Sequence, residues 1–79
     1  PLAEFGSGVH QVNIDIQPGT YRNSDSSPGC YWARLSGFDG KVGDIIVDEN
    51  TDEITTMTIS DSDVGFESKG CGSWTMPDN

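Results

Sequence analysis

Apolar and polar residues alternate along most of the chain with the two-residue period of β-strands. Residues 12–16 are the clearest case, because every second residue is apolar, which is typical of a strand with one buried face. Apolar residues do not recur at helical spacing over three turns anywhere. Short segments with strand character, separated by turn residues, follow at 9–16, 20–23, 30–35, 44–48, 54–59, 64–68 and 71–75. The pattern predicts an all-β fold, a small antiparallel sandwich or barrel of about seven short strands.

Turn-forming residues separate these segments. Pro18-Gly19 predicts a tight turn, because proline fixes φ and glycine accepts positive φ. A polar loop is expected at 23–29, an irregular glycine-rich loop at 36–43, and turns at 49–52 and 60–63.

The segment 30–35 has the composition of a central strand. Alternation places Cys30, Trp32 and Arg34 on one face, and Tyr31, Ala33 and Leu35 on the other. One face must therefore accommodate the charge of Arg34, and a bidentate pair with a carboxylate would satisfy it in a partly buried site. The alternative role for Arg34 is contact with a ligand carboxylate or a sulfate.

Two parts of the chain resemble each other weakly. Val12-x-Ile14 followed by Tyr21-Arg22-Asn23 is echoed, at a constant offset, by Met57-x-Ile59 followed by Phe66-Glu67-Ser68. Each part then leads to a Gly-Cys pair and a nearby tryptophan. This echo predicts two related strand–turn–strand halves with equivalent ends joined by a disulfide; the alternative is chance similarity between amphipathic hairpins.

Length and composition indicate one small domain with a thin core. The chain has 79 residues, of which 33% are hydrophobic, too few to build two cores. We expect a single β domain over 1–79, with 1–5 and 76–79 as loose tails. No apolar run approaches the roughly 20 residues that span a bilayer.

The charge balance excludes one class of partner. Thirteen acids against four bases give a net charge of −9, so nucleic-acid phosphates would be repelled. Residues 40–79 hold nine of the acids and two of the bases, and therefore carry −7 of this charge. An acidic face of this kind predicts either a solvated surface or a cationic partner attracted over some distance.

The two cysteines, Cys30 and Cys71, allow a single pairing. Closing a loop of this size would stabilise the domain by about 4 kcal/mol in the chain-entropy model. Small domains with thin cores use such bonds in oxidising compartments, so an extracytoplasmic location, secreted or at the cell surface, is expected. One histidine and two distant cysteines cannot supply the four ligands of a zinc site.

Several motifs resemble a small domain of bacterial secreted proteins and lipoproteins that is common in actinobacteria. They are GSGVHQV at 6–12, DIQPGTYR at 15–22, CYWARLSGF at 30–38, the pair Ile45-Ile46, and FESKGCGSW at 66–74. The resemblance covers most of the chain, from about Phe5 to Trp74. It implies an exported β domain of the cell envelope with its two cysteines paired, and it implies no particular activity. This chain differs in its strongly acidic second half.

Catalysis is not expected. A nucleophile needs an activating base held by a third group, and the single histidine, His10, has no serine or cysteine within two positions of it. The acids are numerous enough to form close pairs by number alone. No cofactor is predicted.

Calcium binding is a weak possibility. Asp48, Asn50 and Asp52 occupy the first, third and fifth positions of an EF-hand-like loop, and hard cations prefer such oxygen ligands. However, the sixth position is Glu53 and the twelfth is Ile59, where the motif needs glycine and glutamate. A solvated acidic turn is the preferred interpretation.

Aromatic residues suggest a glycan site as another candidate. Trp32, Trp74, Tyr21 and Tyr31 are of the kind that stack on sugar rings. Trp32 is expected in the core beside the disulfide, whereas Trp74, near the C-terminus, could lie on the surface. The possible ligand-binding residues are therefore Trp74, Tyr21, Tyr31 and Arg34.

Together these features predict a non-catalytic extracytoplasmic recognition module that binds a protein through its acidic face. The alternatives are a glycan-binding module of the bacterial surface and a calcium-steadied structural spacer. Salt would separate the first two, because screening weakens ionic binding and leaves aromatic stacking almost unchanged.

Overall fold

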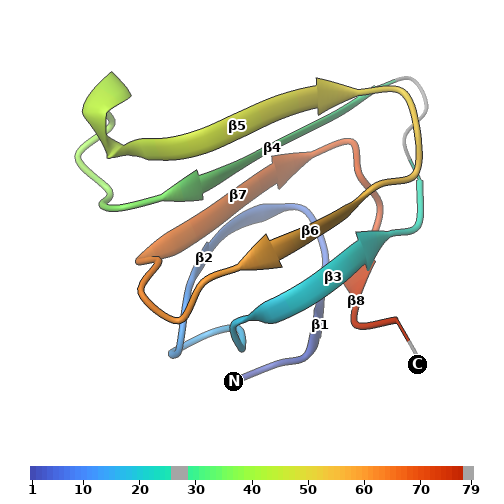
Figure 1. The fold of residues 1–79 in the computed structure, drawn as a ribbon, viewed down its shortest axis with the longest axis horizontal. Coiled ribbons are helices and arrows are strands. Elements are labelled where there is room, and N and C mark those ends of the chain that lie inside the picture. The colour runs from blue at the N-terminus through green and yellow to red at the C-terminus, as the bar shows by residue number, and fades with distance from the viewer. Residues whose placement is uncertain (26–28, 78–79) are drawn as a thin grey trace.

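Eight strands form two four-stranded antiparallel sheets in the computed structural model, which describes residues 1–25 and 29–77 (Figure 1). Sheet I has the strand order β1 (Glu4–Phe5), β8 (Trp74–Thr75), β3 (Gly19–Asn23), β6 (Thr56–Ile59). Sheet II has the order β2 (Gly8–Gln11), β7 (Gly65–Lys69), β4 (Cys30–Leu35), β5 (Ile45–Thr51), with a 3-10 turn, η1 (Val42–Asp44), before β5. The all-β prediction is confirmed. No helix in the described ranges is long and apolar enough to cross a membrane.

The core contains side chains from both sheets. Phe66 of sheet II is fully buried, and its ring contacts the rings of Phe5 and Trp74 from sheet I and of Trp32 from its own sheet. The other buried members of this core are Val12, Ile16, Tyr21, Cys30, Met57, Ile59 and Cys71. Burying each large apolar side chain stabilises by about 1.5–3 kcal/mol. Aromatic side chains therefore make up five of the eleven core residues in a chain with few aliphatic residues.

Residues 1–5 are not the loose tail that the sequence suggested. Glu4 and Phe5 pair with Thr75 and Trp74, and Phe5 is buried. The Leu2 amide donates to the Asp15 carbonyl at 2.9 Å. A two-residue strand has no detectable period, so composition alone could not reveal it. At the other end, Met76 packs against the core, and residues 78–79 lie outside the described residues, as do 26–28 of the predicted polar loop.

The predicted strand 9–16 ends early. The strand itself stops at Gln11, and Asn13 adopts a left-handed conformation with φ 70°, which asparagine tolerates better than most residues. The Gln11 carbonyl accepts the Asp15 amide at 2.8 Å, and the Asp15 carboxylate accepts the Gln11 amide at 2.9 Å. Ile14 consequently lies exposed at 69%. The alternation of residues 12–16 therefore belongs to a tight turn, whose two ends, Val12 and Ile16, are buried.

The region 44–52 also differs from the prediction. A short strand at 44–48 and a turn at 49–52 were expected, but β5 continues to Thr51, paired with Cys30 at the start of β4. The acidic residues Asp48 and Glu49, and Asn50 and Thr51 after them, are therefore strand residues. Their pairing partner, distant in sequence, decides their conformation.

The proposed halves are not equivalent strand–turn–strand units. Val12 and Ile14 lie beyond the end of β2, whereas Met57 and Ile59 lie in β6. Neither predicted unit is a hairpin, because β2 and β3 lie in different sheets, and so do β6 and β7. Instead β2 pairs with β7 and β3 pairs with β6, so each half supplies a strand to the other. Trp74 stands opposite Asn23, and Trp32 stands opposite Ser68, the residue that the repeat equates with Asn23.

Candidate functional site

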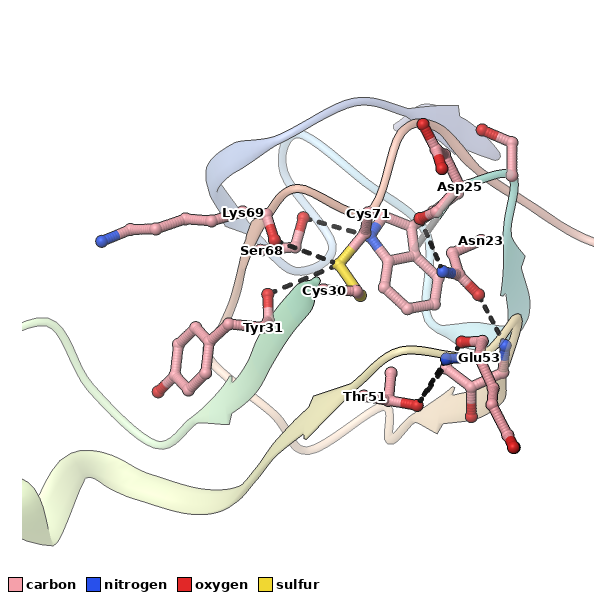
Figure 2. Close-up of a disulfide and its surroundings, with 12 residues drawn as sticks. Asn23, Asp25, Cys30, Tyr31, Thr51, Glu53, Ser68, Lys69 and Cys71 are labelled. Atoms are coloured by element: carbon pink, nitrogen blue, oxygen red, sulfur yellow. Dashed lines mark hydrogen bonds between the residues drawn. A yellow bond between two sulfur atoms is a disulfide. The ribbon is translucent and has the colours of Figure 1, made fainter. Parts of the chain in front are cut away.

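The Cys30–Cys71 disulfide joins the beginning of β4 to the turn after β7 (Figure 2). Both cysteines are buried, and their Cα atoms are 4.6 Å apart across 41 residues of sequence. Gly70 has φ +71° and touches the Gly29 carbonyl so closely that no Cβ could be added there. The glycine before Cys71 therefore allows the two chain segments to approach, and the predicted disulfide is confirmed.

Arg34 forms the bidentate ion pair that its position in β4 predicted. Its Nε donates to Oδ2 of Asp63 at 2.6 Å, and its terminal nitrogen donates to Oδ1 at 3.0 Å. The Asp63 side chain is 1% exposed and also accepts the Ser60 amide at 3.0 Å. Hydrogen bonding to the Asp63 carboxylate raises the pKa of the Arg34 guanidinium. Arg34 thus fixes the turn between β6 and β7 against β4.

The aromatic residues expected to stack on a glycan are mostly buried. Trp74 and Tyr21 are 0% exposed and Trp32 is 6% exposed. The Trp74 indole donates to Ser68 Oγ at 3.0 Å, and the Tyr21 hydroxyl donates to the Gln17 carbonyl at 2.6 Å. The suggestions that Trp74 lies on the surface and that Tyr21 binds a ligand are wrong, because both complete the core. Trp32 is in the core as predicted.

Tyr31 is the exception, since it lies on the outer face of sheet II, away from sheet I. Figure 2 shows its ring and the Lys69 side chain pointing away from the disulfide, and the two residues are paired across β4 and β7. The Tyr31 hydroxyl donates to Asp48 Oδ2 at 3.2 Å. Partial burial, together with Asp48 and Glu67, raises the pKa of Tyr31.

Four exposed acids follow one another along β5 and the turn after it: Asp48, Glu49, Asp52 and Glu53. We call them the acidic strip. Register places Asp48 opposite Ala33 of β4, with Glu67 of β7 opposite the other side of Ala33. Two carboxylates on the outer face therefore flank a small buried residue, and Lys69 lies two positions along β7. The strip adjoins the outer face of sheet II.

The calcium candidates do not lie in a loop. Asp48 and Asn50 are in extended β5, and Asp52 follows the end of that strand. Alternate residues of a strand point to one face and are spaced along it rather than converging on a point. Within the ranges 1–25 and 29–77, no group of three or more histidine, cysteine or acidic side chains could hold a metal ion.

His10 has structural contacts. Its Nε2 lies 2.9 Å from the Gly6 carbonyl, and its ring meets the ring of Phe5 edge-on with centroids 5.0 Å apart. These contacts hold the connection between β1 and β2 against the core.

An apolar groove on the outer face of sheet II was not anticipated from the sequence. It has a volume of about 360 Å³, and Glu67 lies in its wall beside the apolar residues Val9, Leu35, Phe38, Val42 and Ile45. The Phe38 ring covers Gly65 so closely that no Cβ would fit beneath it. The sequence does not reveal this groove, because the contact between Phe38 and Gly65 joins segments that are distant along the chain.

Comparison with known proteins gives one match. No curated protein and no solved structure matches the chain. A family model described as an Rv1352-like extracellular domain matches residues 3–75. The buried disulfide is consistent with this description, because such bonds persist in oxidising compartments outside the cytoplasm. The chain therefore belongs to the family of Rv1352-like extracellular domains and is an extracytoplasmic β domain.

Proposed function

We propose that this extracellular domain is a non-catalytic recognition module that binds a cationic partner protein through the acidic strip. The observation that carries the proposal is the position of the strip. Four exposed carboxylates lie within residues 48–53, without an intervening base, on the edge strand β5 and in the turn after it.

Three of the four acids in the strip have no cationic partner among the described residues. Asp48, Glu49 and Glu53 form no ion pair with any lysine or arginine in the part of the chain that the structure describes. Like charges held this close raise the local negative potential, which attracts a cationic partner and increases its association rate. Lys69, on the outer face of sheet II, leaves the balance of the region negative.

The polar residues best suited to catalysis are occupied within the fold, which supports a binding role. His10 bonds to the Gly6 carbonyl. The Arg34 guanidinium donates two hydrogen bonds to the buried carboxylate of Asp63. Asp48 accepts a hydrogen bond from the Tyr31 hydroxyl, and the single histidine, His10, lies on β2, at the opposite edge of sheet II from β5.

The proposal can be tested with a fluorescent peptide that repeats the sequence Lys-Lys-Val-Val. Glu49→Gln combined with Glu53→Gln removes two strip charges whose side chains hold no hydrogen bond in the described structure. We expect a loss of about tenfold in affinity at low salt, since each exposed pair is worth up to about 1 kcal/mol. Raising the ionic strength should weaken binding of the unaltered domain as well.

The matched control removes two exposed acids elsewhere. Glu4→Gln with Asp39→Asn changes the net charge by the same amount at positions outside the strip. We expect this control to retain affinity within about twofold. Equal losses in the two double variants, or no saturable binding to the unaltered domain, would contradict the proposal.

A further inference from the structure

We propose that the open edge of β5 receives a basic, extended segment of the partner as an added β-strand. This inference rests on the proposed function and specifies how the partner binds. Adding a strand to an exposed edge gives affinity through main-chain hydrogen bonds and selectivity through the alternating side chains.

β5 is the longest free edge among the described residues. The edge strands of the two sheets are β1, β6, β2 and β5. β1 has two residues, and β2 and β6 have four each, whereas β5 has seven. Figure 1 shows β5 as the outermost strand of sheet II, with β4 as its hydrogen-bonded neighbour. In an antiparallel ladder, alternate residues of an edge strand direct both backbone groups away from the neighbour, so β5 offers the longest such row.

The composition of β5 leaves this edge usable. The strand contains no proline or lysine, two of the residues that protect an edge. Leu35 stands opposite Ile45 and Arg34 opposite Val47, so Ile46 forms a bulge near the beginning of the strand. From Val47 to Thr51 the register with β4 is regular. Ile46 and Val47 are 47% and 40% exposed, and an added strand would cover part of this apolar surface.

The charges of β5 disfavour a second copy of this chain at the edge. Antiparallel pairing of two β5 strands centred on Asp48 places Asp48 opposite Asp48. Centring the pair between Asp48 and Glu49 places Asp48 of each strand opposite Glu49 of the other. Like charges directly opposite each other destabilise a sheet, so the acids oppose self-association. The same charges would pair with a strand that carries lysine or arginine.

The charges also specify the partner on both faces. Asp48 stands opposite Ala33 and so points to the outer face of sheet II, while Glu49 stands opposite the core residue Trp32 and points to the other face. A partner strand therefore gains from basic residues at adjacent positions, one for each face. Valine or isoleucine beside them would match the exposed Ile46 and Val47.

The test compares two peptides of equal charge. One is the peptide of repeated Lys-Lys-Val-Val, which presents lysine on both faces of a strand, and the other has the same side chains with every backbone nitrogen methylated. Methylation removes each N–H and prevents strand pairing while retaining every lysine. We expect the methylated peptide to bind at least about tenfold more weakly. We also expect nuclear Overhauser contacts between the α-protons of the unmodified peptide and those of residues 47–51.

The possible outcomes separate the inference from the function on which it rests. Equal binding of the two peptides, with continued dependence on Glu49 and Glu53, would overturn strand addition and leave recognition through the acidic strip in place. Contacts from the peptide to β2 or β6 in place of β5 would also overturn it. Failure of both peptides to bind would overturn the proposed function together with the inference.

Discussion

Arg34 carries a full charge into the middle of β4, and its pairing with Asp63 shows how one residue can tie a distant turn to a sheet. The Asp63 side chain is almost inaccessible to water, so its carboxylate depends on hydrogen bonds from the Arg34 guanidinium and the Ser60 amide. The turn between β6 and β7 consequently has a fixed position against β4.

Arg34→Lys keeps the charge and removes the bidentate geometry. We expect it to lower the free energy of unfolding by about 1–3 kcal/mol, because a buried carboxylate loses part of its hydrogen bonding. The matched control is Arg22→Lys, at an exposed position of β3, for which a change within about 0.5 kcal/mol is expected. Denaturant unfolding of the two variants measures the difference. Similar stabilities would contradict the structural role of Arg34.

The two tryptophans differ in whether the indole N–H has a hydrogen-bond partner. Trp74 Nε1 donates to the buried Ser68 hydroxyl, whereas Trp32 Nε1 is buried with no hydrogen-bond partner in the described structure. Trp74→Phe and Trp32→Phe remove the same atoms from the core. We expect Trp74→Phe to cost about 1–3 kcal/mol more, since it also leaves the Ser68 hydroxyl unpaired. Guanidinium unfolding provides the comparison, and a larger loss from Trp32→Phe would refute this explanation.

At the scale of elements, most strands could be predicted because half-buried strands produce alternation. The errors have local causes. Asn13 turns the chain where alternation continues, and β1 is too short to have a period. The length of β5 is decided by its pairing with β4 and not by its own acidic sequence. Exchange of strands between the halves could not be foreseen either, since the repeat fixes which segments are related and not which ones pair.

The sequence predicts the negative charge of the candidate site, but it does not predict its geometry. The sequence indicates an acidic second half and a solvated acidic segment near residue 50. Sheet order, which makes β5 an outer strand, depends on contacts across the whole chain. The burial of Trp74 and Tyr21 is likewise decided by packing between the sheets, because an aromatic residue in an alternating segment suits either face.

Amide hydrogen exchange tests the status of β5 as an open edge. In the free domain, alternate amides of residues 47–51 should exchange rapidly, while those directed at β4 stay protected. The amides of β4, which has a strand on each side, should be protected throughout residues 31–34. Uniform protection along β5 would contradict an open edge.

For the whole molecule, a thin core and one disulfide stabilise 79 residues, and two tyrosines, Tyr21 in the core and Tyr31 on the outer face of sheet II, make this stability dependent on alkaline pH. Burial raises the pKa of Tyr21, and burial with the nearby carboxylates raises that of Tyr31, above the ordinary value of 10.0. The unfolded chain therefore releases these protons at lower pH than the folded domain does.

The contribution of these tyrosines to the free energy of unfolding should therefore be fully present below the ordinary pKa and decrease as the pH rises above about 10. Urea unfolding across an alkaline pH series measures the decline, and phenolate absorbance of the folded domain follows the ionisation itself. Tyr21→Phe should reduce the decline because it removes a buried ionisable group. Ionisation of both phenols in the folded domain at their ordinary pKa would contradict this account.

The central claim concerns where a basic partner binds, and amide chemical-shift mapping tests it most directly. The isotope-labelled domain would be titrated at low salt with the lysine–valine peptide. The account predicts saturable shifts concentrated in residues 45–53 and in the facing residues of β4, which diminish as salt is added. Shifts centred on β2 or β6, or scattered evenly over all the acids of the surface, would contradict it.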